Sequence, residues 1–126
     1  MKHGLKEVRL YLGIFDYTII MVFGAFSRLE KYLQWKYEDP NIKIVHPNGI
    51  PLGRTSHKGG YVPVIWLPRI PKTNREIATL AHEASHAIDD LIYWLDIEES
   101  NATGEIRGHG IRFIVENVLK LNRRIK

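Results

Sequence analysis

The stretch TLAHEASHAIDD, residues 79–90, contains the pattern H-E-x-x-H as His82, Glu83 and His86. Side chains four residues apart on a helix lie about 5–6 Å from each other at Cβ, so both imidazoles can bind one metal ion. Given the composition of this chain, roughly 0.02 chance matches to the pattern are expected. We therefore expect a helix over this stretch, with His82 and His86 as metal ligands.

A helix-start signal precedes the stretch. Thr73-Asn74-Arg75-Glu76 is a T-x-x-E capping box, and it predicts a helix from about residue 74 to about residue 95. At about 100° per residue, His82, His86 and Asp89 share one face of that helix. The opposite face is apolar and consists of Leu80, Ala84, Ile88, Leu91 and Leu95. The histidines therefore point away from the core.

Glu83 lies on the shoulder of the histidine face. From there it can reach a water molecule bound to the metal but not the metal itself, as the general base of a zinc hydrolase does. A tetrahedral zinc ion held only by His82 and His86 lacks at least one further protein ligand. That ligand is expected from the last helix of the chain.

The last helix is predicted from about residue 103 to about residue 122. One continuous polar stripe runs along it and consists of Glu105, His109, Arg112 and Glu116, while Ile111, Ile114, Val118 and Leu121 face away. Either Glu105 or His109 can serve as the third ligand. Gly108 and Gly110 each cost this helix up to ~1 kcal/mol relative to alanine, which indicates close packing or a close backbone approach there.

Strands and a further helix are predicted before residue 71. Residues 5–13 and 14–23 are strand-like, either as one long strand or as a bent hairpin. An amphipathic helix is expected over residues 25–38, a short strand over 42–45, and a loop-rich segment over 46–60. The strand from Tyr61 to Ile70 contains Pro63 and Pro68, which cannot donate to a ladder, so we expect it at a sheet edge.

Length and composition indicate one soluble domain spanning residues 1–126. There is no cysteine, which excludes disulfides and thiolate metal sites. No signal peptide and no membrane span are evident, so a cytoplasmic protein without membrane association is expected. Residues 76–106 contain eight acidic residues and no lysine or arginine, although the net charge is +4. This charge pattern fits an acidic helix on a basic domain, a bound cation, or a basic surface for nucleic acid.

The order His82-Glu83-x-x-His86 and then Glu105-x-x-Gly108 resembles the gluzincin pattern. The chain is also similar to small H-E-x-x-H proteins of tailed bacteriophages, which implies a bacterial host cytoplasm. The resemblance implies an α+β minimal zincin fold, in which a small sheet with an edge strand packs on the H-E-x-x-H helix. It also implies Glu105 as the third ligand, with His109 beside the metal or near the oxyanion. A competing layout resembles SprT-type zincins and places His109 on the metal.

The expected activity is that of a zinc-dependent metallopeptidase. Zinc would lower the pKa of its bound water to about 7, and Glu83 would take the proton and pass it to the leaving amine. His109 or Tyr93 would stabilise the oxyanion, Asp89 would orient His86, and the strand from Tyr61 to Ile70 would bind an extended peptide. The alternative is a catalytically silent, zinc-stabilised protein that acts by binding a partner. A nucleic-acid-binding module is a third, less favoured hypothesis.

Overall fold

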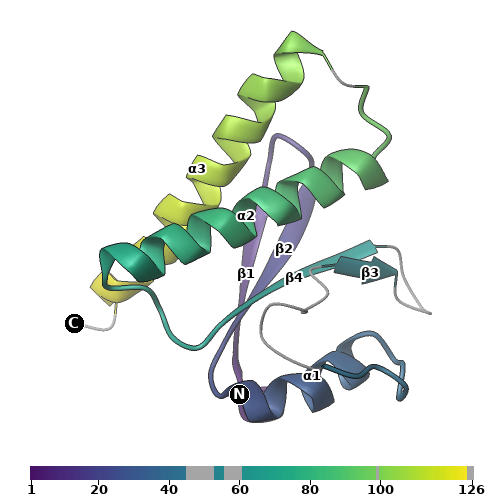
Figure 1. Ribbon diagram of the computed structural model, residues 1–126, viewed down its shortest axis with the longest axis vertical. Helices are drawn as coiled ribbons and strands as arrows, with labels where there is room; N and C mark the ends of the chain where they lie inside the picture. The colour runs from purple at the N-terminus through teal and green to yellow at the C-terminus, as the bar shows by residue number, and fades with distance from the viewer. Residues whose placement is uncertain (45–52, 56–60, 99, 125–126) are drawn as a thin grey trace.

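A mixed β-sheet forms the centre of the fold (Figure 1). The computed structural model describes residues 1–44, 53–55, 61–98 and 100–124. The strands are β1 (Lys6–Leu12), β2 (Tyr17–Phe23), β3 (Gly53–Thr55) and β4 (Tyr61–Leu67), in the order β1-β2-β4-β3. β1 and β2 form an antiparallel hairpin, β2 and β4 are parallel, and β3 is antiparallel to β4.

Helices cover both faces of the sheet. They are the short 3-10 helix η1 (Phe26–Arg28), α1 (Leu29–Lys36), α2 (Asn74–Trp94) and α3 (Asn101–Arg124). Alternate residues of a strand point to opposite faces: Ile19 and Met21 pack in one cluster with α2 and α3, whereas Ile20 and Val22 pack in a second cluster with α1. The predicted α+β class is therefore confirmed.

The first strands form a hairpin rather than one long strand. Its turn is closed by the Asp16 amide, which donates to the Gly13 carbonyl at 3.2 Å. Asp16 has a φ of 51°, a conformation that aspartate tolerates better than most residues. The Tyr11 hydroxyl also donates to the Asp16 carboxylate at 2.6 Å. Because this turn lacks the usual Asn-Gly or Asp-Gly signal, its position could not be read from the sequence.

The predicted edge position of the strand from Tyr61 to Ile70 is wrong. β4 ends at Leu67 and lies inside the sheet, between β2 and β3. Its parallel pairing with β2 runs from Val64 to Leu67, so it starts after Pro63 and ends before Pro68. Pro63 therefore lies outside that ladder and Pro68 lies past the end of the strand, so neither has to donate a hydrogen bond to β2.

The predicted strand over residues 42–45 is also wrong for residues 42–44, and Val45 lies outside the described residues. Side chains of α1 bind the backbone here instead of a neighbouring strand. Gln34 donates to the Ile42 carbonyl at 3.0 Å, and the Ile44 amide donates to Glu30 at 3.0 Å. Within the loop-rich segment 46–60, the structure describes only β3.

Candidate metal centre

The helix that carries the histidines begins at Asn74, as the capping box predicts. The Thr73 hydroxyl accepts from the Glu76 amide at 3.2 Å, and the Glu76 carboxylate accepts from the Thr73 amide at 3.0 Å. Arg69 adds an ion pair to the same carboxylate at 2.5 Å. The Arg69 contact, together with the backbone donors of Thr73 and Lys72, lowers the pKa of Glu76 to about 2. The start of α2 is therefore set locally, by residues 69–76.

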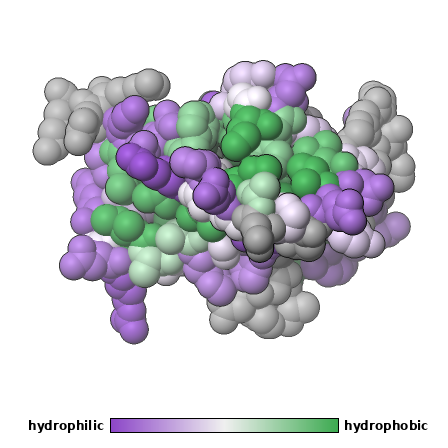
Figure 2. Space-filling view, turned by 90° about the horizontal axis from the view of Figure 1, so that it is seen from above, coloured by the Kyte–Doolittle hydropathy of each residue, from purple (hydrophilic) through white to green (hydrophobic). Residues whose placement is uncertain are grey.

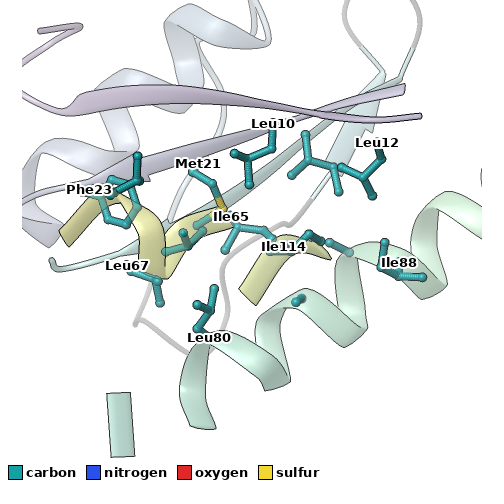
Figure 3. Packing of buried hydrophobic residues seen from close by; sticks show 14 of the residues in the cluster. Leu10, Leu12, Met21, Phe23, Ile65, Leu67, Leu80, Ile88 and Ile114 are labelled. Atoms are coloured by element: carbon teal, nitrogen blue, oxygen red, sulfur yellow. The ribbon is translucent and has the colours of Figure 1, made fainter. Parts of the chain in front are cut away.

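The apolar face of α2 turns the histidines towards solvent. Leu80, Ala84, Ile88 and Leu91 are fully buried, and Figure 3 shows Leu80 pointing towards Leu67 of the sheet. His82 and His86, on the opposite face, are exposed. The predicted division of α2 into a core face and a histidine face is confirmed, except that Leu95 lies past the helix end and is exposed.

His82 and His86 converge. Their Nε2 atoms lie 3.0 Å apart, and the rings meet edge to face with centroids 4.5 Å apart. Two nitrogens bound to one tetrahedral zinc ion at about 2.0–2.1 Å are separated by about 3.3 Å. The pair thus fits two positions of a zinc site after a small adjustment. Without a metal, a proton on one Nε2 can bridge the two rings.

The side chains closest in sequence to the histidine pair are small or acidic. Glu83 is partly buried next to His82, as expected for a residue on the shoulder of the face. The Ser85 hydroxyl donates to the His82 carbonyl at 2.6 Å, so it is turned towards its own helix backbone. Asp90 lies close enough to His86 for an electrostatic interaction. Partial burial raises the pKa of Asp90, and the interaction with His86 opposes that shift.

Glu105 and His109 do not join the histidine pair. Across the part of the chain that the structure describes, no three His, Cys, Asp or Glu residues are grouped so that they could hold a metal ion. Both residues are exposed on α3, whose opposite face buries Ile114 and Val118 in the core shared with α2. Since α2 and α3 turn their apolar faces to one core, their polar stripes point to different sides. Which residue is the third ligand stays a prediction.

His109 instead faces the tip of the β1–β2 hairpin. It lines a cleft of about 390 Å³ together with Leu12, Gly13, Ile14, Arg112, Phe113 and Glu116. Figure 2 views the end of the molecule that carries this tip and shows apolar surface between hydrophilic patches. The polar partner of Arg112 is Glu116, one turn further along α3, at 2.8 Å. The surroundings of His109 are thus mostly apolar and lie away from the histidine face of α2.

Asp89 is held by a residue that the sequence reasoning missed. The Arg107 guanidinium donates to the Asp89 carboxylate at 2.5 Å. Arg107 lies on the apolar side of α3, about 200° around the helix from Glu105, and a cation there signals an acidic partner on the neighbouring helix. The two residues line a cleft of about 520 Å³ with Ile92, Tyr93 and Ile97. The described contact of Asp89 is thus with Arg107 and not with His86. Tyr93 is 88% exposed, so its predicted role at the oxyanion stays a prediction.

No protein-family model, curated protein or solved structure matches this chain. The described helices include none that is long and apolar enough to cross a membrane. The functional assignment therefore depends on the geometry of the α2 face and on the chemistry of its side chains.

Proposed function

We propose that the chain is a zinc-dependent metallopeptidase with His82 and His86 as metal ligands and Glu83 as general base. The observation that carries the proposal is the 3.0 Å separation of the two Nε2 atoms on an exposed helix face. A single hydrogen bond between the rings also accounts for this separation, but the pair lies within about 0.3 Å of the nitrogen spacing that one tetrahedral zinc ion requires. Binding of a divalent cation gives a physical reason for the arrangement.

The residues around the pair support hydrolysis. Zinc supplies Lewis acidity and a bound water with a pKa of about 7. Glu83 follows His82 directly in α2 and its side chain is partly buried, on the shoulder of the histidine face. It would take the proton of the attacking water and deliver it to the leaving amine. A carboxylate in this position has no role in a purely structural zinc site, which favours the peptidase.

Glu105 remains the proposed third ligand and His109 the proposed oxyanion donor. Either role requires α3 to turn about its axis towards the histidine face. The contact of Gly110 with Ile88 and the ion pair of Arg107 with Asp89 oppose that rotation. The peptidase proposal therefore predicts that metal binding rearranges the α2–α3 contact.

A catalytically silent zinc protein that binds a partner is the second candidate. It is favoured because no third His, Cys, Asp or Glu among the described residues is grouped with the histidine pair, and a two-histidine site is open to ligands from another molecule. In that case zinc would link molecules and Glu83 would be dispensable.

Metal content and peptidase activity of four variants test both candidates. We expect zinc in the wild type and in Glu83→Gln, and none in His86→Ala. Cleavage of a peptide library should disappear in Glu83→Gln while zinc is retained. Glu105→Gln and His109→Ala separate the two ligand sets, because loss of a direct ligand should lower zinc affinity by more than the roughly 10–100-fold that loss of a residue supporting a ligand costs. A wild type that binds no zinc rules out both candidates; zinc without any cleavage leaves only the second.

A further inference from the structure

We infer that the histidine face of α2 is a self-association surface, on which two copies of the chain share one zinc ion. The surface is centred on His82 and His86, is flanked by Ala78, Thr79 and Ser85, and has Arg75 and Tyr93 at its two ends. The inference rests on the metal binding of the proposed function but not on peptidase activity. A metal closed by four histidines has no open position, so hydrolysis belongs to the unpaired chain.

Coordination is the first reason. Each chain offers two converging nitrogens, and closed zinc sites have four ligands. Two histidine pairs related by a two-fold axis therefore complete one tetrahedral site. The residues that the structure describes supply no third ligand, and both imidazoles are exposed, so a second copy can reach them.

Side-chain size is the second reason. Ala78, Thr79 and Ser85 lie next to the histidines on this face and have small side chains, and Asp89 and Asp90 follow His86 by about one turn. The Ser85 hydroxyl is turned back to the His82 carbonyl, and the Thr79 hydroxyl donates to the Arg75 carbonyl at 3.1 Å. Helix axes approach to about 8–10 Å depending on the side chains between them. Small residues allow the close approach that shared coordination needs.

Charge distribution is the third reason, and it selects an antiparallel arrangement. A two-fold axis at position 84, midway between the histidines, places His82 of one copy against His86 of the other. The same axis places Arg75, at the basic end of the face, opposite the exposed ring of Tyr93 and one turn from Asp90. Cation–π and charge attraction both favour this contact. Antiparallel helix dipoles add to it, whereas a parallel pair would place like charges together.

Molar mass as a function of zinc tests the inference. Sedimentation equilibrium of the wild type should show the 14.6 kDa monomer in chelator, and a species of twice that mass when half an equivalent of zinc per chain is added. His86→Ala should stay monomeric at every zinc concentration, and its circular dichroism should match the wild type, which excludes misfolding as the cause.

A charge reversal tests the arrangement independently of the ligands. Arg75→Glu leaves both histidines intact and should weaken zinc-dependent pairing by about tenfold or more, because it removes the cation–π contact with Tyr93 and places a carboxylate one turn from Asp90 of the other copy. Lys31→Glu is the matched control: it makes the same change in net charge on α1, where Lys31 is exposed, and should leave pairing unchanged.

The outcomes separate this inference from the proposed function. A wild type that binds no zinc overturns both. Zinc bound at one ion per chain, with the mass of the monomer, overturns the self-association alone. A zinc-dependent dimer that Arg75→Glu does not weaken overturns the antiparallel arrangement.

Discussion

Gly110 of α3 lies directly against Ile88 of α2, so that a Cβ on Gly110 would come within 2.8 Å of the Ile88 Cδ1 atom. The contact lets the two helices approach closely at this point. Together with the ion pair between Arg107 and Asp89, it sets the rotation of α3 about its own axis. That rotation turns Glu105 and His109 away from the histidine pair. The absence of a Cβ at Gly110 therefore influences which residues can reach the metal site.

Alanine at this position is expected to destabilise the fold. Gly110→Ala must displace the Ile88 side chain, and overpacking of this kind costs about 1–3 kcal/mol. Gly108→Ala is the control, because no described atom lies within 4 Å of a Cβ there; it should stabilise the protein by about 0.4–1 kcal/mol. Urea unfolding of both variants gives the two free energies. Equal stabilisation by both would show that the helices are not closely packed at Gly110.

Thr73 is expected to account for much of the stability of the start of α2. Thr73→Ala removes the acceptor for the Glu76 amide and should lower the free energy of unfolding by about 1 kcal/mol. Thr79→Ala provides a matched control within the same helix, since alanine has the higher helix propensity and Thr79 is exposed. A loss of stability in Thr79→Ala as large as that in Thr73→Ala would contradict the capping role.

The capping box should also depend on pH. The pKa of Glu76 is lowered from 4.5 to about 2 in the folded chain, so its contribution is complete above pH 4.5 and is lost as the pH falls towards 2. Glu76→Gln cannot titrate. The difference in melting temperature between wild type and Glu76→Gln should therefore shrink between pH 4.5 and pH 2, and a constant difference would argue against the ion pair with Arg69.

Tyr32 and Glu7 form a polar contact in the layer opposite α2. The Tyr32 hydroxyl donates to the Glu7 carboxylate at 2.5 Å, and the Glu7 side chain is only 10% exposed. Tyr32→Phe should cost about 1.5–3 kcal/mol, the range for a hydrogen bond to a charged group. Tyr11→Phe removes a hydrogen bond to Asp16 from a tyrosine that is 57% exposed, and we expect a much smaller effect.

Acid should weaken the Tyr32 contact. Burial opposes ionisation of Glu7, but the hydrogen bond from Tyr32 and the charge of Lys36 outweigh it and lower the pKa of Glu7. The stabilisation is therefore present above the ordinary pKa of 4.5 and is lost as the pH falls through the lowered value. Unfolding at pH 7 and at pH 3 should show a smaller difference between wild type and Tyr32→Phe in acid.

The features that depend on neighbouring residues were predictable without a structure. The capping box from Thr73 to Glu76 acts within one turn, so the start of α2 could be predicted from these four residues alone. The periodicity of α2 and α3 likewise separated apolar from polar faces, because burial of one face is a property of each helix alone. The pair of His82 and His86 needed only the four-residue spacing of a single helix.

Features that depend on contacts between distant segments emerged only with the tertiary structure. The central place of β4 depends on pairing with β2, some forty residues earlier, and the prolines alone suggested an edge. The position of Glu105 and His109 depends on how α3 packs against α2 at Gly110 and Ile88. A helical wheel gives the angle of a residue around the axis of its own helix. The rotation of α3 relative to α2 is set by packing in their shared core, which no wheel describes.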